Sequence, residues 1–105
     1  MNSKQKGNRG ERELAEELRK YGYDTRRGHQ YNGQTDEADV VGVPGLHIEC
    51  KRVEKGLNLE EALAQSTRDA RQGEIPVVIH RRNYESWKVT MSLGEFMAMW
   101  KERKE

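Results

Sequence analysis

The chain has 105 residues, which is room for one domain and not for two. Charged residues make up 35% of it and hydrophobic residues 33%, so any core must be small and depend on a sheet. One cysteine excludes an internal disulfide, and no apolar stretch approaches the roughly 20 residues of a membrane helix or forms a signal-peptide core, so we expect a soluble, cytoplasmic protein.

The charges are unevenly distributed along the chain. Residues 1–35 contain eight Lys and Arg against five Asp and Glu, whereas residues 36–85 contain seven against ten. A basic leading segment beside an acidic middle suits a protein that binds a polyanion around a carboxylate metal site. Ordinary solvated surface charge would give the same counts, so the composition leaves both interpretations open.

The first half of the chain predicts a helix followed by three strands. After a flexible start over residues 1–6, Leu14, Leu18 and Tyr21 recur at helical spacing, and Gly22 ends the helix. A segment rich in Gly, Gln and Asn, after the first strand, is expected to be a loop. The expected elements are a helix over residues 8–21 and strands over residues 23–27, 38–43 and 46–52.

The second half predicts a helix, two strands and a closing helix. Asn58 and Ser92 are the expected N-caps of the two helices, and Gly73 ends the first of them. Strands are expected over residues 75–80 and 86–91. The order αβββαββα predicts an α/β domain with a mixed central β-sheet flanked by α-helices. The remaining large apolar residues are expected in the core or in a dimer interface: Trp87, Phe96, Met97 and Trp100.

Two carboxylates and a lysine fall on successive strands. The strand period of two places Glu49 and Lys51 on one face of their strand, opposite Ile48 and Cys50. If the preceding strand pairs with it antiparallel, Asp39 lies near Glu49, and a hard divalent cation would relieve the repulsion between the carboxylates. The alternative is an exposed ion pair between Glu49 and Lys51, with Asp39 as a turn residue.

The first helix adds a third carboxylate. At about 100° per residue, Glu11 lies in the middle of the apolar face that contains Leu14 and Leu18. A carboxylate aimed at the core costs several kcal/mol unless it meets a metal or a cation. The simpler alternative is a hydrated Glu11 that interacts with the helix dipole.

Together these segments resemble a known family. The runs KGNRGERELAEELRKYGY, ADVVG and HIECKR, followed by a helix that carries Gln65, resemble the PD-(D/E)XK nuclease superfamily. They are most similar to its Holliday-junction resolvase branch, including small phage-encoded members, over residues 6 to about 91. The resemblance implies a restriction-endonuclease-like core and a Mg²⁺-dependent endonuclease that hydrolyses DNA phosphodiesters, preferably in branched DNA.

The resemblance also implies the roles of individual residues. Asp39 and Glu49 would bind Mg²⁺ or Mn²⁺ together with the backbone carbonyl of Cys50, and Lys51 would orient or activate the attacking water. Glu11 would complete the site directly or through water, and Gln65 would lie nearby. Two neighbouring acids, Asp36 and Glu37, leave the identity of the first ligand open.

Several basic residues are candidates for contacts to DNA phosphates, which hold the nucleic acid without reading its sequence. They are Lys4, Lys6, Arg9, Arg12, Arg26, Arg27, Arg52, Arg81 and Arg82. Because one site cannot cut a four-way junction symmetrically, we expect a homodimer. The alternatives are a nuclease of this fold that acts on other DNA or RNA structures, a DNA-binding module without catalysis, and an interaction domain that binds no nucleic acid.

Overall fold

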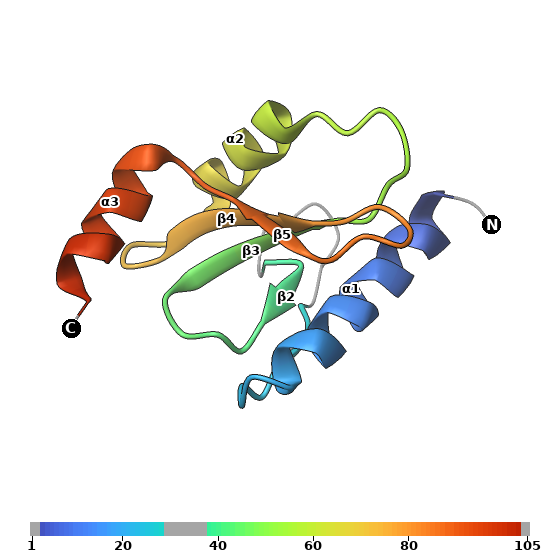
Figure 1. Ribbon diagram of the computed structural model, residues 1–105, viewed down its shortest axis with the longest axis horizontal. Coiled ribbons are helices and arrows are strands. Elements are labelled where there is room, and N and C mark those ends of the chain that lie inside the picture. Colours follow the sequence, from blue (N-terminus) through green and yellow to red (C-terminus); the bar gives the residue numbers. More distant parts are fainter. Residues whose placement is uncertain (1–2, 29–37, 104–105) are drawn as a thin grey trace.

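The computed structural model describes residues 3–28 and 38–103 of the chain (Figure 1). The expected order of elements is confirmed. The elements are α1 (Ser3–Arg19), β1 (Arg26–Arg27), β2 (Val40–Val41), β3 (Leu46–Lys51), α2 (Leu59–Asp69), β4 (Ile75–His80), β5 (Lys88–Thr90) and α3 (Leu93–Glu102). The loop expected between β1 and β2, including Asp36 and Glu37, lies outside the described residues.

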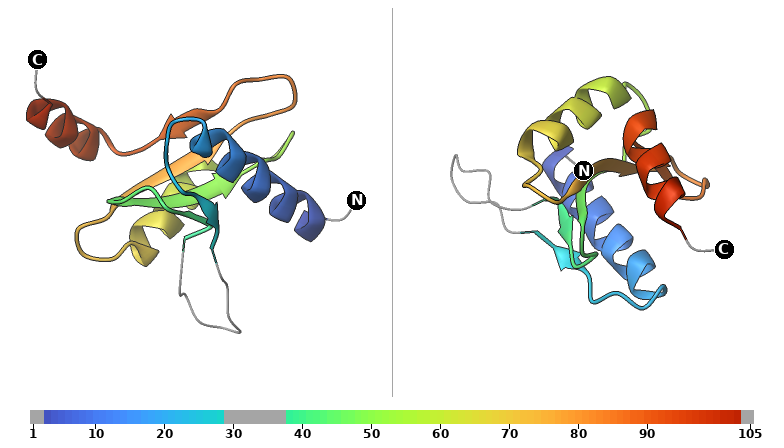
Figure 2. Two further views of the ribbon diagram at one scale, coloured as in Figure 1. Left: turned by 90° about the horizontal axis from the view of Figure 1, so that it is seen from below. Right: turned by 90° about the vertical axis from the view of Figure 1, so that its left-hand side faces the viewer.

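Five strands form one mixed sheet in the order β1-β2-β3-β4-β5. The central pair, β3 and β4, is parallel, and the other neighbouring pairs are antiparallel. Helix α2 connects the parallel pair and covers one face of the sheet, whereas α1 covers the other (Figures 1 and 2). The predicted α/β class and mixed sheet are therefore confirmed.

The core lies between α1 and the sheet. Leu14 and Ala15 of α1 pack against alternate residues of three strands, and the cluster consists of Leu14, Ala15, Val40, Ile48, Cys50, Val77 and Ile79. Ile48 and Cys50 belong to it because a strand turns alternate side chains to the same face. The opposite face of β3 carries Glu49, which therefore lies outside this apolar cluster.

The N-cap predictions for the two later helices are confirmed. Asn58 accepts a hydrogen bond from the backbone N–H of Glu61, and Ser92 accepts one from Glu95. Helix α1 begins at Ser3, five residues earlier than predicted, because the polar residues before Gly7 include good helix formers. Helix α1 therefore includes part of the segment that was expected to be flexible.

Helix α3 stands apart from the rest of the fold. It projects beyond the end of the sheet, and none of its residues is buried (Figures 1 and 2). Phe96, Met97 and Trp100 are exposed, whereas Trp87 packs against the core, so the chain's own core covers only one of these four apolar side chains. Among the described helices, none is long and apolar enough to cross a bilayer.

Candidate active site

The β2–β3 hairpin brings Asp39 and Glu49 together. Val40 pairs with Ile48, and the N–H of Asp39 donates to the Ile48 carbonyl at 2.9 Å, so Asp39 and Glu49 lie across the strands from one another. The N–H of Cys50 donates to Asp39 Oδ2 at 2.8 Å. A hydrogen bond also joins the carboxyl groups of Asp39 and Glu49. The predicted antiparallel hairpin and the proximity of the two carboxyls are both confirmed.

Burial makes it unfavourable for both groups to be ionised. The Glu49 side chain is only 7% exposed. Burial raises its pKa from 4.5 to about 7, and the charge of Asp39 adds to this rise. Burial also raises the pKa of Asp39, although the N–H of Cys50 acts in the opposite direction. Two acids this close therefore hold a proton between them near neutral pH, or require a cation.

Lys51 and Glu11 complete the cluster. Lys51 Nζ lies 3.7 Å from Glu49 Oε1, and its charge also acts on Asp39 and Glu11. The Glu11 side chain is 13% exposed and accepts a hydrogen bond of 2.9 Å from Arg27 Nε. Burial raises the pKa of Glu11 in spite of Arg27. The predicted burial of Glu11 is thus confirmed, and Arg27 is the cation that offsets its cost.

The donor set fits a hard divalent cation with few protein ligands. Across residues 3–28 and 38–103, no three His, Cys, Asp or Glu side chains converge closely enough to hold a metal ion. Mg²⁺ is commonly bound by one or two carboxylates, with waters and substrate phosphate oxygens supplying the remaining ligands. Asp39 and Glu49 provide such a pair, and a cation would offset the negative charge that burial makes unfavourable at both carboxyls.

Comparisons with known proteins agree with this geometry. The family model described as "Phage putative PDDEXK endonuclease" matches residues 2–104. The chain belongs to this PDDEXK endonuclease family. Among solved structures, it is similar to Hjc, a Holliday junction resolvase from the archaeal hyperthermophile Archaeoglobus fulgidus. The TM-score is 0.57 with 26% sequence identity, over 82% of this chain and 72% of that chain. No curated protein matches the chain.

The family and this neighbour identify the chain as a nuclease with a restriction-endonuclease-like fold. They confirm the resemblance seen in the sequence. PD-(D/E)XK nucleases generally use divalent metal ions, which agrees with the paired carboxylates of β2 and β3.

Helix α2 of the endonuclease carries Gln65, which stays a predicted neighbour of the site, and also Asp69, which the sequence analysis did not single out. Gln65 is exposed, whereas Asp69, one turn further along, is half-buried and its charge acts on Glu49. The four-residue spacing of Gln65 and Asp69 was the available signal, because both lie on the same side of a helix. His47 was also missed, although strand alternation puts it on the same face as Glu49.

The candidate DNA-contacting residues fall into two groups. Arg9, Arg12, Arg26 and Arg82 are exposed. The side chains of Lys4 and Lys6 lie outside the part of the chain that the structure describes. Arg52, Arg81 and Arg27 are less exposed and make ion pairs within the fold, and the exposed Arg9 also pairs with Glu13 on α1.

Arg52 is the most enclosed of these cations. Its side chain is 12% exposed and bonds to Glu13, Glu54 and Asn83. This network ties the end of β3 to α1 and to the β4–β5 turn. Little of the Arg52 guanidinium is therefore left exposed for a contact to a phosphate.

Proposed function

We propose that the endonuclease hydrolyses DNA phosphodiester bonds with the help of Mg²⁺ or Mn²⁺, and that branched DNA is its preferred substrate. The observation that supports this most directly is the cluster of Glu11, Asp39, Glu49 and Lys51. It draws three acids and one ammonium group from a helix and two strands. Asp39 and Glu49 would hold the cation, together with the backbone carbonyl of Cys50.

The chemistry follows from the charges of the cluster. When bound, a divalent cation supplies an acidified water and neutralises charge on the phosphoryl group. Lys51 Nζ, next to Glu49, offers a fixed positive charge to the phosphate as negative charge builds up on its oxygens. Glu11 accepts a hydrogen bond from Arg27, which holds its carboxyl group in place.

A cleavage assay tests this proposal. Labelled four-way junction and matched linear duplex are incubated with the protein in Mg²⁺, Mn²⁺ or EDTA. Glu49→Ala and Lys51→Ala should lose at least about a hundredfold in rate, since each removes charge from the reacting centre. Lys20→Ala is the matched control, because Lys20 lies just after α1 and forms an exposed ion pair with Glu17. Cleavage that survives in EDTA, or in both site variants, would contradict the mechanism.

Competition experiments address the choice of substrate. Unlabelled junction should suppress cleavage of labelled junction more strongly than linear duplex, flapped duplex or RNA does. Equal suppression by another structure would favour the alternative nuclease of the same fold. Salt-dependent DNA binding without cleavage in any metal would favour the non-catalytic binding module.

We also propose that the endonuclease acts as a homodimer paired through α3. Leu93 and Trp100 are 73% and 49% exposed, and with Phe96 and Met97 they recur at helical spacing along one face. Exposed apolar patches of roughly 300–600 Å² often mark contacts between proteins. A standard interface buries about 800 Å² on each partner, so this face could supply a large apolar part of one.

A second copy of the chain fits α3 for two reasons. The first turn of α3 carries Glu95 and the last turn carries Lys101, next to Glu102, so an antiparallel pair can place Glu95 of each copy near Lys101 of the other. A twofold dimer also carries two sites related by the symmetry of a four-way junction.

Sedimentation at micromolar concentration, with and without junction DNA, tests the dimer. Trp100→Glu should convert dimer to monomer, whereas Tyr21→Glu, which changes an exposed aromatic residue outside α3, should not. A wild-type protein that is monomeric under both conditions contradicts the proposal.

A further inference from the structure

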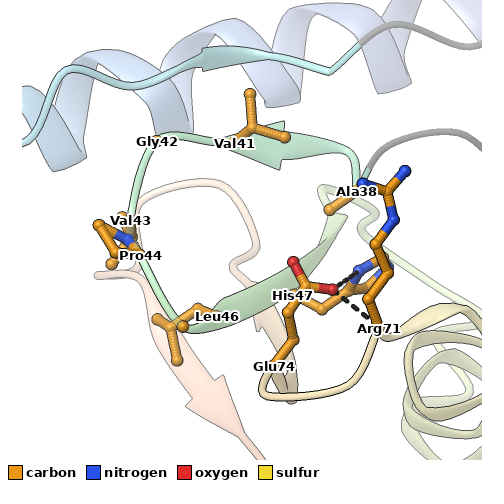
Figure 3. Close-up of a pocket in the computed structure, with 10 residues that line it drawn as sticks. Ala38, Val41, Gly42, Val43, Pro44, Leu46, His47, Arg71 and Glu74 are labelled. Atoms are coloured by element: carbon orange, nitrogen blue, oxygen red, sulfur yellow. Dashed lines mark hydrogen bonds and ion pairs between the residues drawn. The ribbon is translucent and has the colours of Figure 1, made fainter.

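A cavity of about 260 Å³ opens beside the proposed catalytic centre (Figure 3). It lies between the β2–β3 hairpin and the turn that leads from α2 into β4. Its lining is mixed: Val41, Val43 and Leu46 contribute apolar surface, and His47 and Glu74 contribute polar groups. A pocket for a drug-sized molecule usually measures roughly 300–1,000 Å³, so this smaller cavity suits a ligand of about the size of one nucleotide base.

The cavity is lined by sequence neighbours of the two carboxylates. Ala38, which lines the cavity, directly precedes Asp39. His47 lies two residues before Glu49 on the same face of β3, close enough for its charge to act on Asp39. A group held in the cavity would therefore be a direct neighbour of a phosphate bound at Asp39 and Glu49.

The polar side of the cavity is held in a defined arrangement by Glu74. Its Oε1 lies 3.3 Å from Nδ1 of the buried His47 ring and accepts the backbone N–H of Arg71 at 2.8 Å (Figure 3). Both interactions use the same oxygen. In the described part of the chain, Oε2 forms no hydrogen bond, and it points into the cavity in Figure 3. A carboxylate oxygen accepts hydrogen bonds and cannot donate them when ionised.

We propose that this cavity holds the base of one unpaired nucleotide next to the scissile phosphate, and that Glu74 Oε2 accepts a hydrogen bond from its exocyclic amino group. The apolar lining would contact the face of the base. The inference rests on the proposed nuclease function and adds a reason for a preference for branched DNA. Taking a base out of a duplex costs a few kcal/mol, and the cost is least where the base is already unpaired, as at a branch point.

Single-position changes in the substrate test the inference. A junction series carries one abasic nucleotide at each position near the cleaved bond in turn. At one position, loss of the base should slow cleavage roughly tenfold, the effect expected when a contact to a base is lost. Thymine at that position should also be cleaved more slowly than adenine, cytosine or guanine, because only thymine lacks an exocyclic amino group.

Glu74→Gln is the matched variant. Its amide oxygen can still accept from Arg71 and His47, so the turn is retained, but an NH₂ group replaces Oε2. The variant should cleave amino-bearing substrates roughly tenfold more slowly than wild type, because a hydrogen bond to a charged group is lost. On the abasic substrate the two proteins should cleave at the same rate. Glu61→Gln, an exposed acid on α2, is the control and should match wild type on every substrate.

The outcomes distinguish a failure of the base pocket from a failure of the proposed nuclease function. Absence of cleavage on every substrate would refute the nuclease proposal itself. Cleavage that is insensitive to the base at all positions would leave the nuclease intact and overturn the pocket. A Glu74→Gln variant slowed equally on abasic and normal junctions would show a structural role for Glu74 and would also overturn it.

Discussion

Replacing Glu49 by Gln should stabilise the metal-free protein at alkaline pH. Glu49 is 7% exposed, and burial, aided by Asp39, raises its pKa from 4.5 to about 7. The folded state therefore binds a proton that the unfolded state releases between these two pH values. Stability associated with the protonated group is complete below pH 4.5 and is lost as the pH rises through 7. The difference between the two pKa values corresponds to about 3 kcal/mol.

Glutamine keeps the shape of Glu49 and never ionises, so it should escape this loss. In EDTA at pH 8, Glu49→Gln should exceed wild type by about 3 kcal/mol in the free energy of unfolding, and the two should converge near pH 4.5. Urea denaturation followed by circular dichroism measures this difference at each pH. Comparing the two proteins also removes the contribution of His80, whose pKa is lowered by burial and by Lys88.

Mg²⁺ extends the same experiment. At pH 8 the cation should raise the stability of wild type by offsetting the two carboxylates, and it should do so much less for Glu49→Gln. Glu16→Gln removes an exposed carboxylate from α1 and should follow wild type throughout. Parallel stability curves for wild type and Glu49→Gln between pH 5 and 8 would refute the reasoning, because the carboxyl of Glu49 would then gain no proton on folding.

Three other substitutions test separate parts of the fold. Lys51→Met should reduce cleavage by about a hundredfold or more. It should change the free energy of unfolding by less than about 1 kcal/mol, because the ammonium group is partly exposed. A large loss of stability in urea would contradict this expectation. Gly42→Ala should cost at least about 2 kcal/mol, because Gly42 has a φ of 114° and its new methyl group would meet the Asp24 carbonyl. Gly73→Ala, with positive φ but open space, is its control and should cost less in the same denaturation assay. Ser66→Ala should cost about 1 kcal/mol, because the buried hydroxyl donates to two strand carbonyls; an unchanged urea midpoint would contradict it.

Local patterns were sufficient to predict much of the fold. The alternation in β3 assigned Ile48 to the core and Glu49 to the opposite face, and a helical projection placed Glu11 on the buried side of α1. The hairpin that brings Asp39 to Glu49 was predictable because a short turn between consecutive strands favours antiparallel pairing. Each of these inferences depends on residues that are close in sequence.

Other features of the site depend on contacts between distant segments. Gln65 and Asp69 share one side of α2, and only the packing of the helix against β3 decides that Asp69 is the one whose charge acts on Glu49. In the sequence, Arg52 has the pattern of an exposed surface cation. In the structure, its side chain is enclosed by contacts to α1 and to the β4–β5 turn. The amphipathic pattern of α3 predicts a buried face, yet it does not say whether this chain or a partner covers it.

The sequence by itself determined the order of elements, the face of each side chain and the set of acids available for a metal, because periodicity and turn chemistry act over a few residues. Only the tertiary structure decided which charges meet, which cations are enclosed and where a cavity opens beside the carboxylates. These features arise when segments far apart in the chain pack together, and their burial determines whether a charge is hydrated, paired or held close to another of the same sign.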